Sequence, residues 1–278
     1  MAINTAAAGK TYPASTYEVT ADAIRAYAAA TNEVNPAFTG EEPVGPPAFP
    51  VVAAQPVLAM ALFDPELEVN LARLVHGEED HRLLAPIRPG DVLTVEGRLD
   101  TIEVKESGET FTVATTLTNQ DGAVAAEVRS LLFVRGSGSR AKGAAGEPPP
   151  EPEYVFTTEQ TVDENQTYRY AEASGDHNPI HTDPEFARNV AGLPGIILHG
   201  MATMAFASRA VLDAVAGGDP SRLRRIKVRF SKPVFPGETL TTRGWVAGSE
   251  NGTTTYGFET LNARGSLVLS NGIAEVTA

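Results

Sequence analysis

The sequence predicts an α+β protein built from two copies of one unit. Three observations predict this class: an internal repeat, the same order of helical and alternating patterns in each copy, and a linker-like segment between the copies. The stretch from Val19 aligns with the stretch from Val162 at an offset of 143 (162 − 19). The stretch from Arg82 aligns with the stretch from Arg229 at an offset of 147 (229 − 82). The second copy has therefore gained a few residues in between.

The segment between the copies marks the boundary. Residues 136–153 are rich in glycine, serine and proline, a composition typical of an inter-domain linker. We therefore predict a first domain at 1–135 and a second domain at 154–278. Either is large enough to bury a core of its own.

Each copy reads in the same order: a short strand, a helix, an irregular loop, a longer apolar helix and several strands. In the second copy the first helix begins near Val162 and stops at Gly175, because glycine commonly follows a helix end. The longer helix begins at Gly200. Its apolar positions recur at helical spacing and predict one buried stripe, interrupted by one serine: Met201, Met204, Ala205, Ser208, Val211, Leu212 and Val215.

The strands come last in each copy. In the second copy apolar and polar residues alternate from Ile226 to Phe230, and further alternating runs cover 239–247, 253–261 and 267–276. This alternation predicts antiparallel strands with one face in water. A sheet can bury the long helix by curling around it, and two copies can join sheet edges so that fewer edges stay exposed.

Composition excludes several classes. Of the residues, 42% are hydrophobic and 21% charged, which is ordinary for a soluble globular protein. The net charge of −13 argues against nucleic acid as a partner. There is no cysteine, which excludes disulfides, thiolate metal sites and a cysteine nucleophile. The start lacks a signal sequence and the apolar windows are interrupted, so we expect a cytoplasmic protein without membrane insertion.

The most informative motif is SGDHNPIH, from Ser174 to His181. Pro179 disfavours a helix here, so we expect a turn that carries Asp176 and His181 just past a helix end. A carboxylate and an imidazole on one loop suit acid–base chemistry. Taken alone, a capped turn with a satisfied histidine explains these residues equally well. A metal site that also uses His177 is disfavoured, because the proline breaks the helical spacing of the two histidines.

The motif and its surroundings resemble a known family. YAEASGDHNPIHTDPEFA, the His-Gly pair in GIILHGMATMAFASRAV and the later KPVFPGE resemble, in order, the MaoC-like (R)-specific enoyl-CoA hydratases, also called hydratase 2. The match covers most of Val162 to Ala278. It implies a tandem (double) hot-dog fold, with antiparallel sheets each wrapped around a central helix. The first copy resembles the degenerate half of two-hot-dog members, with Glu33, Phe38 and Phe49-Pro50 in place of the reacting residues.

The resemblance implies reversible syn hydration of trans-2-enoyl thioesters to (3R)-hydroxyacyl thioesters at one site per chain. Asp176 and His181 would jointly hold the water, and the sequence leaves open which of them takes its proton. Asn178 would fix the loop or the water. The backbone of Gly200, at a helix start, would stabilise the enolate oxygen, and Ser208 would hydrogen-bond the aspartate. Taken without the resemblance, Gly200 could simply let helix and sheet approach closely, and Ser208 could equally bond back within its own helical turn. His199 is expected to be structural, as are His76 and His81.

The substrate's carrier is suggested by a basic cluster. Six cations lie in one stretch of an acidic protein and could contact the phosphates of coenzyme A or an acyl carrier protein: Arg222, Arg224, Arg225, Lys227, Arg229 and Lys232. A solvated strand face explains them equally well. No nucleotide, flavin or metal motif occurs, so we expect no cofactor. The family is compatible with a homodimer.

Other functions stay open. The closest alternative is a (3R)-hydroxyacyl-carrier-protein dehydratase of lipid or polyketide assembly. A non-catalytic acyl-thioester-binding protein and a thioesterase are less favoured. The inactive first copy is hypothesised to widen the space for a long acyl tail.

Overall fold

The protein is described by a computed structural model that covers residues 3–105, 108–136 and 151–278. Most of the predicted linker, residues 137–150, lies outside the described residues.

Within the described residues, the first half contains three helices and five strands, with a 3-10 turn at Thr5–Ala7 and another at Leu71–Arg73. In chain order these are β1 (Ser15–Glu18), α1 (Ala21–Ala30), α2 (Pro36–Thr39), α3 (Pro50–Leu62), β2 (Leu74–Leu83), β3 (Val92–Lys105), β4 (Gly108–Thr118) and β5 (Val124–Arg135).

The second half repeats this order with one additional short helix, α6, and has a 3-10 turn at Pro220–Arg222. Its elements are β6 (Phe156–Thr161), α4 (Gln166–Ser174), α5 (Pro179–Thr182), α6 (Pro184–Asn189), α7 (Gly200–Val215), β7 (Leu223–Phe230), β8 (Thr239–Glu250), β9 (Thr253–Asn262) and β10 (Leu267–Thr277). Both the long helix from Gly200 and the alternating strands occur where the sequence predicts them.

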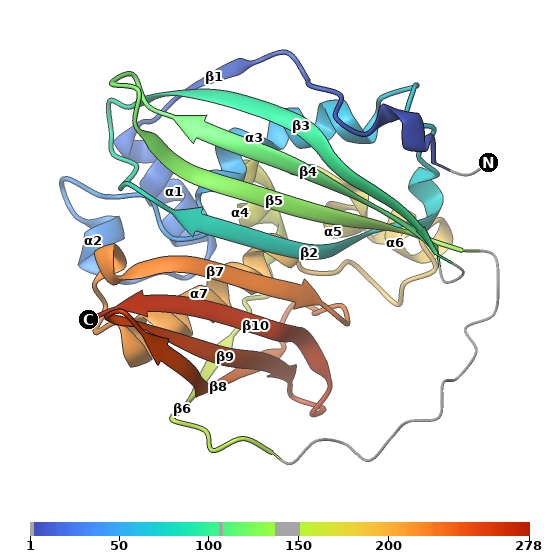
Figure 1. Ribbon diagram of the computed structural model, residues 1–278. Coiled ribbons are helices and arrows are strands. Elements are labelled where there is room, and N and C mark those ends of the chain that lie inside the picture. The colour runs from blue at the N-terminus through green and yellow to red at the C-terminus, as the bar shows by residue number, and fades with distance from the viewer. Residues whose placement is uncertain (1–2, 106–107, 137–150) are drawn as a thin grey trace.

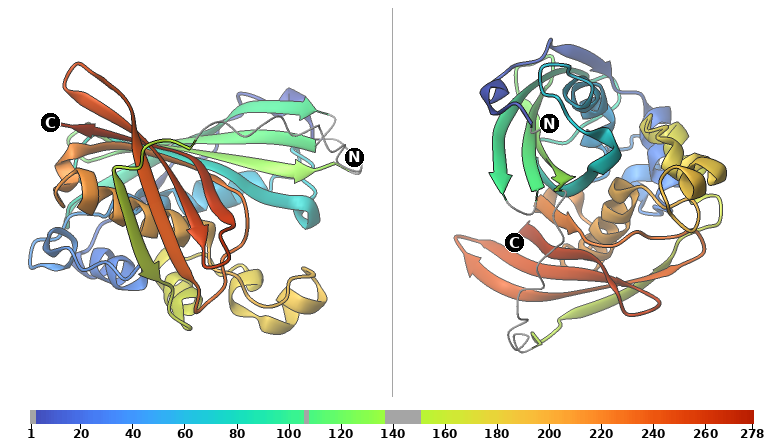
Figure 2. Two further views of the ribbon diagram at one scale, coloured as in Figure 1. Left: turned by 90° about the horizontal axis from the view of Figure 1, so that it is seen from below. Right: turned by 90° about the vertical axis from the view of Figure 1, so that its right-hand side faces the viewer.

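The described strands form one antiparallel sheet of ten strands in the order β1-β3-β4-β5-β2-β7-β10-β9-β8-β6 (Figure 1). The helices lie against one face of this sheet, and each half of it curls around its own long helix (Figure 2). Helix α3 packs on β3, β4 and β5, whereas α7 packs on β6, β7, β8 and β10. This arrangement is the tandem hot-dog fold that the sequence predicts.

The two halves are related by an approximate twofold axis. Asp80 of β2 lies opposite Lys227 of β7, and the offset of 147 makes these two residues equivalent (227 − 80). On the helical layer the hydroxyls of Tyr27 and Tyr170 lie 3.4 Å apart, and these are equivalent at the offset of 143 (170 − 27). The predicted joining of sheet edges therefore occurs between β2 and β7.

Helix α7 is more deeply buried than its apolar stripe predicts. All eight residues from Met201 to Ser208 are buried. The stripe is the face that a flat sheet would cover. The half-sheet instead curls around α7 and contacts it through four strands. The faces outside the stripe are filled mostly by small residues and by the fully buried ring of Phe206, so the enclosure leaves little empty space.

Ion pairs hold the joint between the half-sheets. Arg225 of β7 binds both carboxylate oxygens of Asp80 on β2, at 2.8 and 2.7 Å, and it also binds Glu275 at 2.8 Å. Lys227 pairs with Glu78 across the same joint at 2.9 Å. The hydrogen bonds to Asp80 and Glu275 raise the pKa of Arg225 further above its ordinary value, although burial opposes this.

These pairs change the reading of the basic cluster. Arg225 and Lys227 contact carboxylates of the chain itself, which disfavours them as contacts to a carrier. Three other members also have partners within the chain: Arg222 donates to the carbonyls of Thr277 and Ala216, Arg224 to that of Leu84, and Lys232 to the Ser266 hydroxyl. Among the described residues, the side chain of Arg229 alone in this cluster makes no hydrogen bond or ion pair.

None of the helices in the described ranges is both long enough and apolar enough to cross a membrane.

Candidate active site

The site begins where α4 ends. Gly175 follows the helix in the left-handed conformation (φ 76°), as the sequence predicts, and turns the chain so that Asp176 leaves the helix axis. The Asp176 carboxylate accepts a hydrogen bond from the backbone N–H of Asn178 at 3.1 Å. The Asn178 side chain in turn accepts from the N–H of Ile180 at 3.2 Å and caps the next helix. Asn178 therefore fixes the loop.

His181 lies in a helical turn, and the prediction of a non-helical turn was wrong at this point. Pro179 is the first residue of α5, where the missing N–H of proline has no helical partner to lose. The constraint on the residue before proline falls on Asn178, which is the cap and is extended. The short helix points His181 inward, and its side chain is buried.

The hydrogen bond of His181 sets its tautomer. Its Nδ1 lies 2.8 Å from the carbonyl of Ile197, which can only accept, so Nδ1 carries the proton. The other ring nitrogen, Nε2, is then unprotonated in the neutral ring and can accept a proton. Burial lowers the pKa of His181, and the nearby charge of Asp176 opposes this in part. The ring is therefore neutral at physiological pH.

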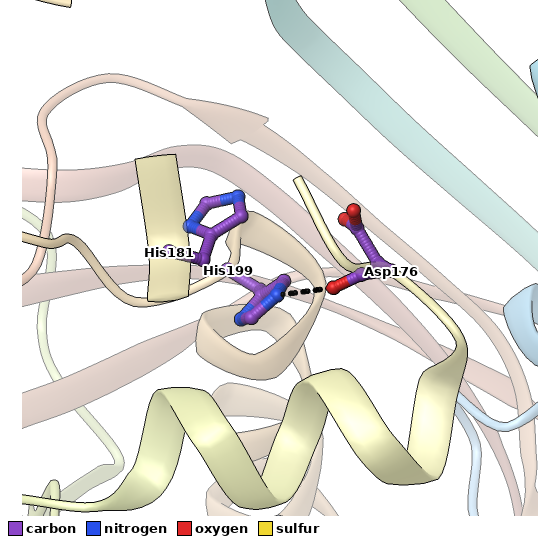
Figure 3. Close-up of side chains that lie close together, drawn as sticks. All are labelled: Asp176, His181 and His199. Atoms are coloured by element: carbon purple, nitrogen blue, oxygen red, sulfur yellow. Dashed lines mark hydrogen bonds between the residues drawn. The ribbon is translucent and has the colours of Figure 1, made fainter. Parts of the chain in front are cut away.

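His199 connects the two reacting groups. Its ring stacks on that of His181, with 3.8 Å between the centroids and 26° between the planes. Its Nε2 donates to the backbone carbonyl of Asp176 at 3.0 Å (Figure 3). Burial and the neighbouring His181 lower the pKa of His199 to about 3, so it is neutral. The expected structural role of His199 takes a specific form here, because it holds both Asp176 and His181 in place.

The three side chains cluster closely but in a poor geometry for a metal. A carboxylate oxygen of Asp176 and ring nitrogens of His181 and His199 lie within 4.8 Å of one another. A bound zinc would lie about 2.0–2.1 Å from each nitrogen and in the plane of each ring, and two stacked, nearly parallel rings do not allow this. His177 does not join the cluster, since its side chain is 60% exposed and lies near Glu172.

Gly200 brings the start of α7 against β7. A Cβ atom at this position would lie 3.1 Å from the Phe230 ring, so a larger residue would have to move that ring. The preceding residue, His199, makes no side-chain cap hydrogen bond. The first N–H groups of α7 thus keep their capacity to bind a negatively charged oxygen, and the helix dipole favours it.

Ser208 corrects a prediction. Its hydroxyl donates to the carbonyl of Ala205 at 2.8 Å, within the same helix, and it makes no hydrogen bond to Asp176 among the described residues. Eight residues separate Ser208 from Gly200 in α7, a rise of about 12 Å, which leaves the serine too far along the helix from the loop. A buried serine inside a helix commonly bonds back to the preceding turn.

The equivalent loop of the first half holds no comparable pair. The Glu33 carboxylate accepts hydrogen bonds from the N–H groups of Val34 and Asn35, at 2.8 and 2.9 Å. Phe38, at the position of His181, is fully buried. Phe49 packs edge-on against Tyr27, with 5.5 Å between centroids, as His199 packs against Tyr170 in the second half. The fold of the site is repeated without its acid–base groups.

A buried cluster near the site was missed by sequence reasoning. The carboxylate of Glu79 on β2 is fully buried and contacts ring nitrogens of His76 at 2.7 Å and His81 at 2.9 Å. Burial alone would raise the pKa of Glu79, but the two hydrogen bonds outweigh it and lower the pKa to about 2. Burial raises the pKa of Tyr170, and the charges of Tyr27, Asp176 and Glu79 add to this.

A signal for the cluster was present in the sequence. Glu79 and His81 are two residues apart and share one face of a strand. His76 reaches the same carboxylate because the register of β2 shifts between His76 and Glu78, and the sequence marks such a bulge only by Gly77.

Comparison with known proteins identifies the family. The family described as MaoC like domain matches residues 146–264, and the FAS1-like, dehydratase domain region matches residues 6–128. The 3-hydroxyacyl-thioester dehydratase Y of Mycobacterium tuberculosis is 36% identical over 220 residues, which cover 75% of this chain and 74% of that protein. The chain belongs to the MaoC-like dehydratase family.

Two further comparisons place this MaoC-like protein. The probable enoyl-CoA hydratase 2 of Dictyostelium discoideum is 33% identical over 219 residues, which cover 75% of this chain and 71% of that protein. The crystal structure of a MaoC-like dehydratase from Phytophthora capsici superposes with a TM-score of 0.82 at 28% identity, over 99% of this chain and 98% of that chain. Both the predicted family and the predicted fold class are thereby confirmed.

Proposed function

We propose that this protein is an (R)-specific 2-enoyl-CoA hydratase, equivalently a (3R)-hydroxyacyl-CoA dehydratase in reverse, and thus a hydro-lyase. The observation that carries the proposal is the pairing of the Asp176 carboxylate with His181, whose ring is fixed by the Ile197 carbonyl and stacked on His199. The relatives named as a hydratase 2 and as a 3-hydroxyacyl-thioester dehydratase support the same reaction.

The proposed reaction begins with a water molecule held between Asp176 and His181. As the water oxygen attacks Cβ of the enoyl group, one of the pair takes a proton from the water. The Nε2 atom of His181 is suited to this step, because Nδ1 donates to a carbonyl and the buried ring is neutral. A proton delivered to Cα on the same face completes a syn addition, and one water is consumed for each double bond.

Negative charge grows on the thioester oxygen during this step. We assign its stabilisation to the backbone N–H of Gly200 at the start of α7, where the helix dipole favours an anion. Asn178 supports the reaction by fixing the loop. Ser208 takes no direct part, since its hydroxyl bonds within α7. None of these steps requires a cofactor.

The carrier of the acyl group is either coenzyme A or an acyl carrier protein. Arg229 is the member of the basic cluster that we retain as a candidate phosphate contact, because it is exposed on β7. We further propose that the inactive first half makes room for a long acyl tail, so that a C16 thioester reacts faster than a C4 thioester. A homodimer and a cytoplasmic location remain predictions.

The proposal is tested by the products formed from trans-2-enoyl thioesters. Crotonyl-CoA and trans-2-decenoyl-CoA are incubated with the protein, and the products are separated on a chiral column while free thiol is measured in parallel. A (3R)-hydroxyacyl-CoA without thiol release is expected. Thiol release would support a thioesterase, and binding without turnover would support an acyl-binding protein. Comparing kcat/KM for one acyl group on coenzyme A and on carrier protein identifies the carrier.

A further inference from the structure

A cavity of about 370 Å³ lies at the joint of the two halves, next to the N-terminal end of α3. Its walls come from the segments 37–50, 83–88 and 219–224, with Ala125 from β5. Neither Asp176 nor His181 lines it. The cavity is therefore separate from the site described above.

The duplication explains where this cavity lies. The backbone N–H of Val44 donates to the carbonyl of Ala37 at 2.8 Å, and in the second half Ile197 donates to Ile180 in the same way at 3.2 Å. Ala37 and Ile180 are equivalent at the offset of 143 (180 − 37). Segment 37–50, which leads into α3, is therefore the first-half equivalent of the segment after Ile180 that leads into α7.

A second pair of contacts repeats at the sheet. Gly45 donates to the carbonyl of Ile87 at 2.9 Å, and Leu198 donates to that of Val234 at 2.8 Å. Ile87 and Val234 are equivalent at the offset of 147 (234 − 87). The cavity thus lies beside the segment of the first half that corresponds to the loop leading into α7 in the second. Glu33, Phe38 and Phe49, the equivalents of Asp176, His181 and His199, do not line it.

The lining of the cavity suits an apolar chain with an anionic end. Most of its side chains are apolar, and they include three buried prolines in segment 46–50, which give the wall a fixed shape. Two arginines are among the lining residues: Arg88, which is exposed, and Arg224, whose guanidinium donates to the carbonyl of Leu84 at 3.1 Å.

Two acids share this lining with the arginines. The carboxylate of Asp219 is held by the N–H and the hydroxyl of Ser221, at 2.9 and 2.7 Å. Glu42 is exposed. The planar N–H donors of a guanidinium group are well matched to a carboxylate or phosphate.

We propose that this cavity is a second, non-catalytic binding site for a medium-length straight acyl chain with an anionic end. A volume of about 370 Å³ lies at the small end of the range for ligand pockets, which favours a medium rather than a long chain. The residues that line the cavity include neither Asp176 nor any histidine, so a bound acyl group is retained unchanged. A free fatty acid and an acyl-CoA share this chemistry. The site is independent of the proposed hydratase activity.

The proposal is tested by filling the cavity with a large side chain. Ala85 lines the cavity and is half-buried, so Ala85→Trp fills it from the wall. The matched control is Ala263→Trp, which lies in a different cavity, of about 530 Å³, on the outer side of β8 and β9. Equilibrium dialysis with radiolabelled decanoate and with decanoyl-CoA measures the molecules bound per chain, and crotonyl-CoA turnover is measured alongside.

The expected result is that Ala85→Trp binds one molecule fewer per chain than wild type, with crotonyl-CoA turnover unchanged, while Ala263→Trp binds as wild type does. Loss of decanoate binding identifies a fatty-acid site, and loss of decanoyl-CoA binding alone identifies an acyl-CoA site. Equal binding by all three proteins would overturn the proposal. A failure of the hydratase proposal would leave this comparison intact, because the readout is a difference in binding.

A second measurement covers the case in which the tryptophan variant does not fold. In wild type, affinity for straight-chain carboxylates is expected to rise about fourfold for each added methylene until the cavity is full. The double variant Arg88→Gln/Arg224→Gln is expected to bind decanoate at least about tenfold more weakly and 1-decanol equally well. An affinity for decanoate that neither chain length nor these arginines change would contradict the proposed site.

Discussion

Replacing Glu79 with glutamine removes a fully buried charge at the joint of the two halves. The hydrogen bonds of His76 and His81 outweigh the effect of burial and lower the pKa of Glu79 from 4.5 to about 2, a difference of about 2.5 (4.5 − 2). One pKa unit corresponds to about 1.36 kcal/mol, so ionised Glu79 contributes about 3 kcal/mol to the free energy of unfolding at neutral pH. Because its pKa is lower in the folded state, this contribution is complete above pH 4.5 and is lost as the pH falls toward about 2.

Urea unfolding at several pH values measures this contribution. We expect Glu79→Gln to be about 3 kcal/mol less stable than wild type at neutral pH, and the difference to shrink steadily as the solution is acidified below pH 4.5. The matched control is Glu78→Gln, a neighbouring carboxylate that is partly exposed and pairs with Lys227, for which a loss below about 1 kcal/mol is expected. The reasoning is refuted if both variants lose the same small amount, or if the difference for Glu79→Gln does not depend on pH.

Three further predictions concern the site. His199→Phe copies Phe49 of the first half, and it keeps the aromatic packing but loses the hydrogen bond to the Asp176 carbonyl. We expect kcat to fall about tenfold with KM little changed. An unchanged kcat would contradict the positioning role. The pH profile of kcat/KM for hydration is expected to be flat at neutral pH and to fall only below the ordinary histidine pKa of 6.5, because burial lowers the pKa of His181 and its neutral form is required; a fall that begins above pH 7 would contradict this. Gly200→Ala places a methyl group 3.1 Å from the Phe230 ring. We expect it to lower kcat about 10²-fold or more, because it displaces the N–H assigned to the enolate oxygen, and we expect partial recovery when Phe230→Leu is added. A Gly200→Ala rate equal to wild type would rule out that assignment.

The fold could be predicted because the duplication constrains it strongly. Once Arg82 is aligned with Arg229, the equivalence of Asp80 and Lys227 follows, and the two residues lie opposite each other where β2 meets β7. The repeat could not predict which side chains hold that joint. In the sequence Arg225 and Lys227 belong to a basic cluster, and only the antiparallel register brings Asp80 and Glu78 of β2 diagonally next to them.

The site could be predicted in part, for reasons of distance along the chain. Asp176 and His181 are found from one short motif, because their separation is set by a single turn. His199 is eighteen residues beyond His181 (199 − 181), and its stacking depends on how α7 returns to the loop. The bond from Ser208 to the aspartate was implied by the family resemblance, but the Ser208 hydroxyl bonds within α7, and helical rise carries it away from the loop.

The most direct test of the account compares hydration rates of trans-2-decenoyl-CoA for wild type, Asp176→Asn and His181→Gln, with His177→Gln as the matched control. His177 lies in the same motif but is 60% exposed, so its substitution tests whether any change in the loop impairs the enzyme. The account predicts a (3R) product from wild type and His177→Gln at similar rates, and a loss of about 10²–10⁴-fold in each of the other two variants. A folded Asp176→Asn or His181→Gln protein that hydrates at the wild-type rate would contradict it.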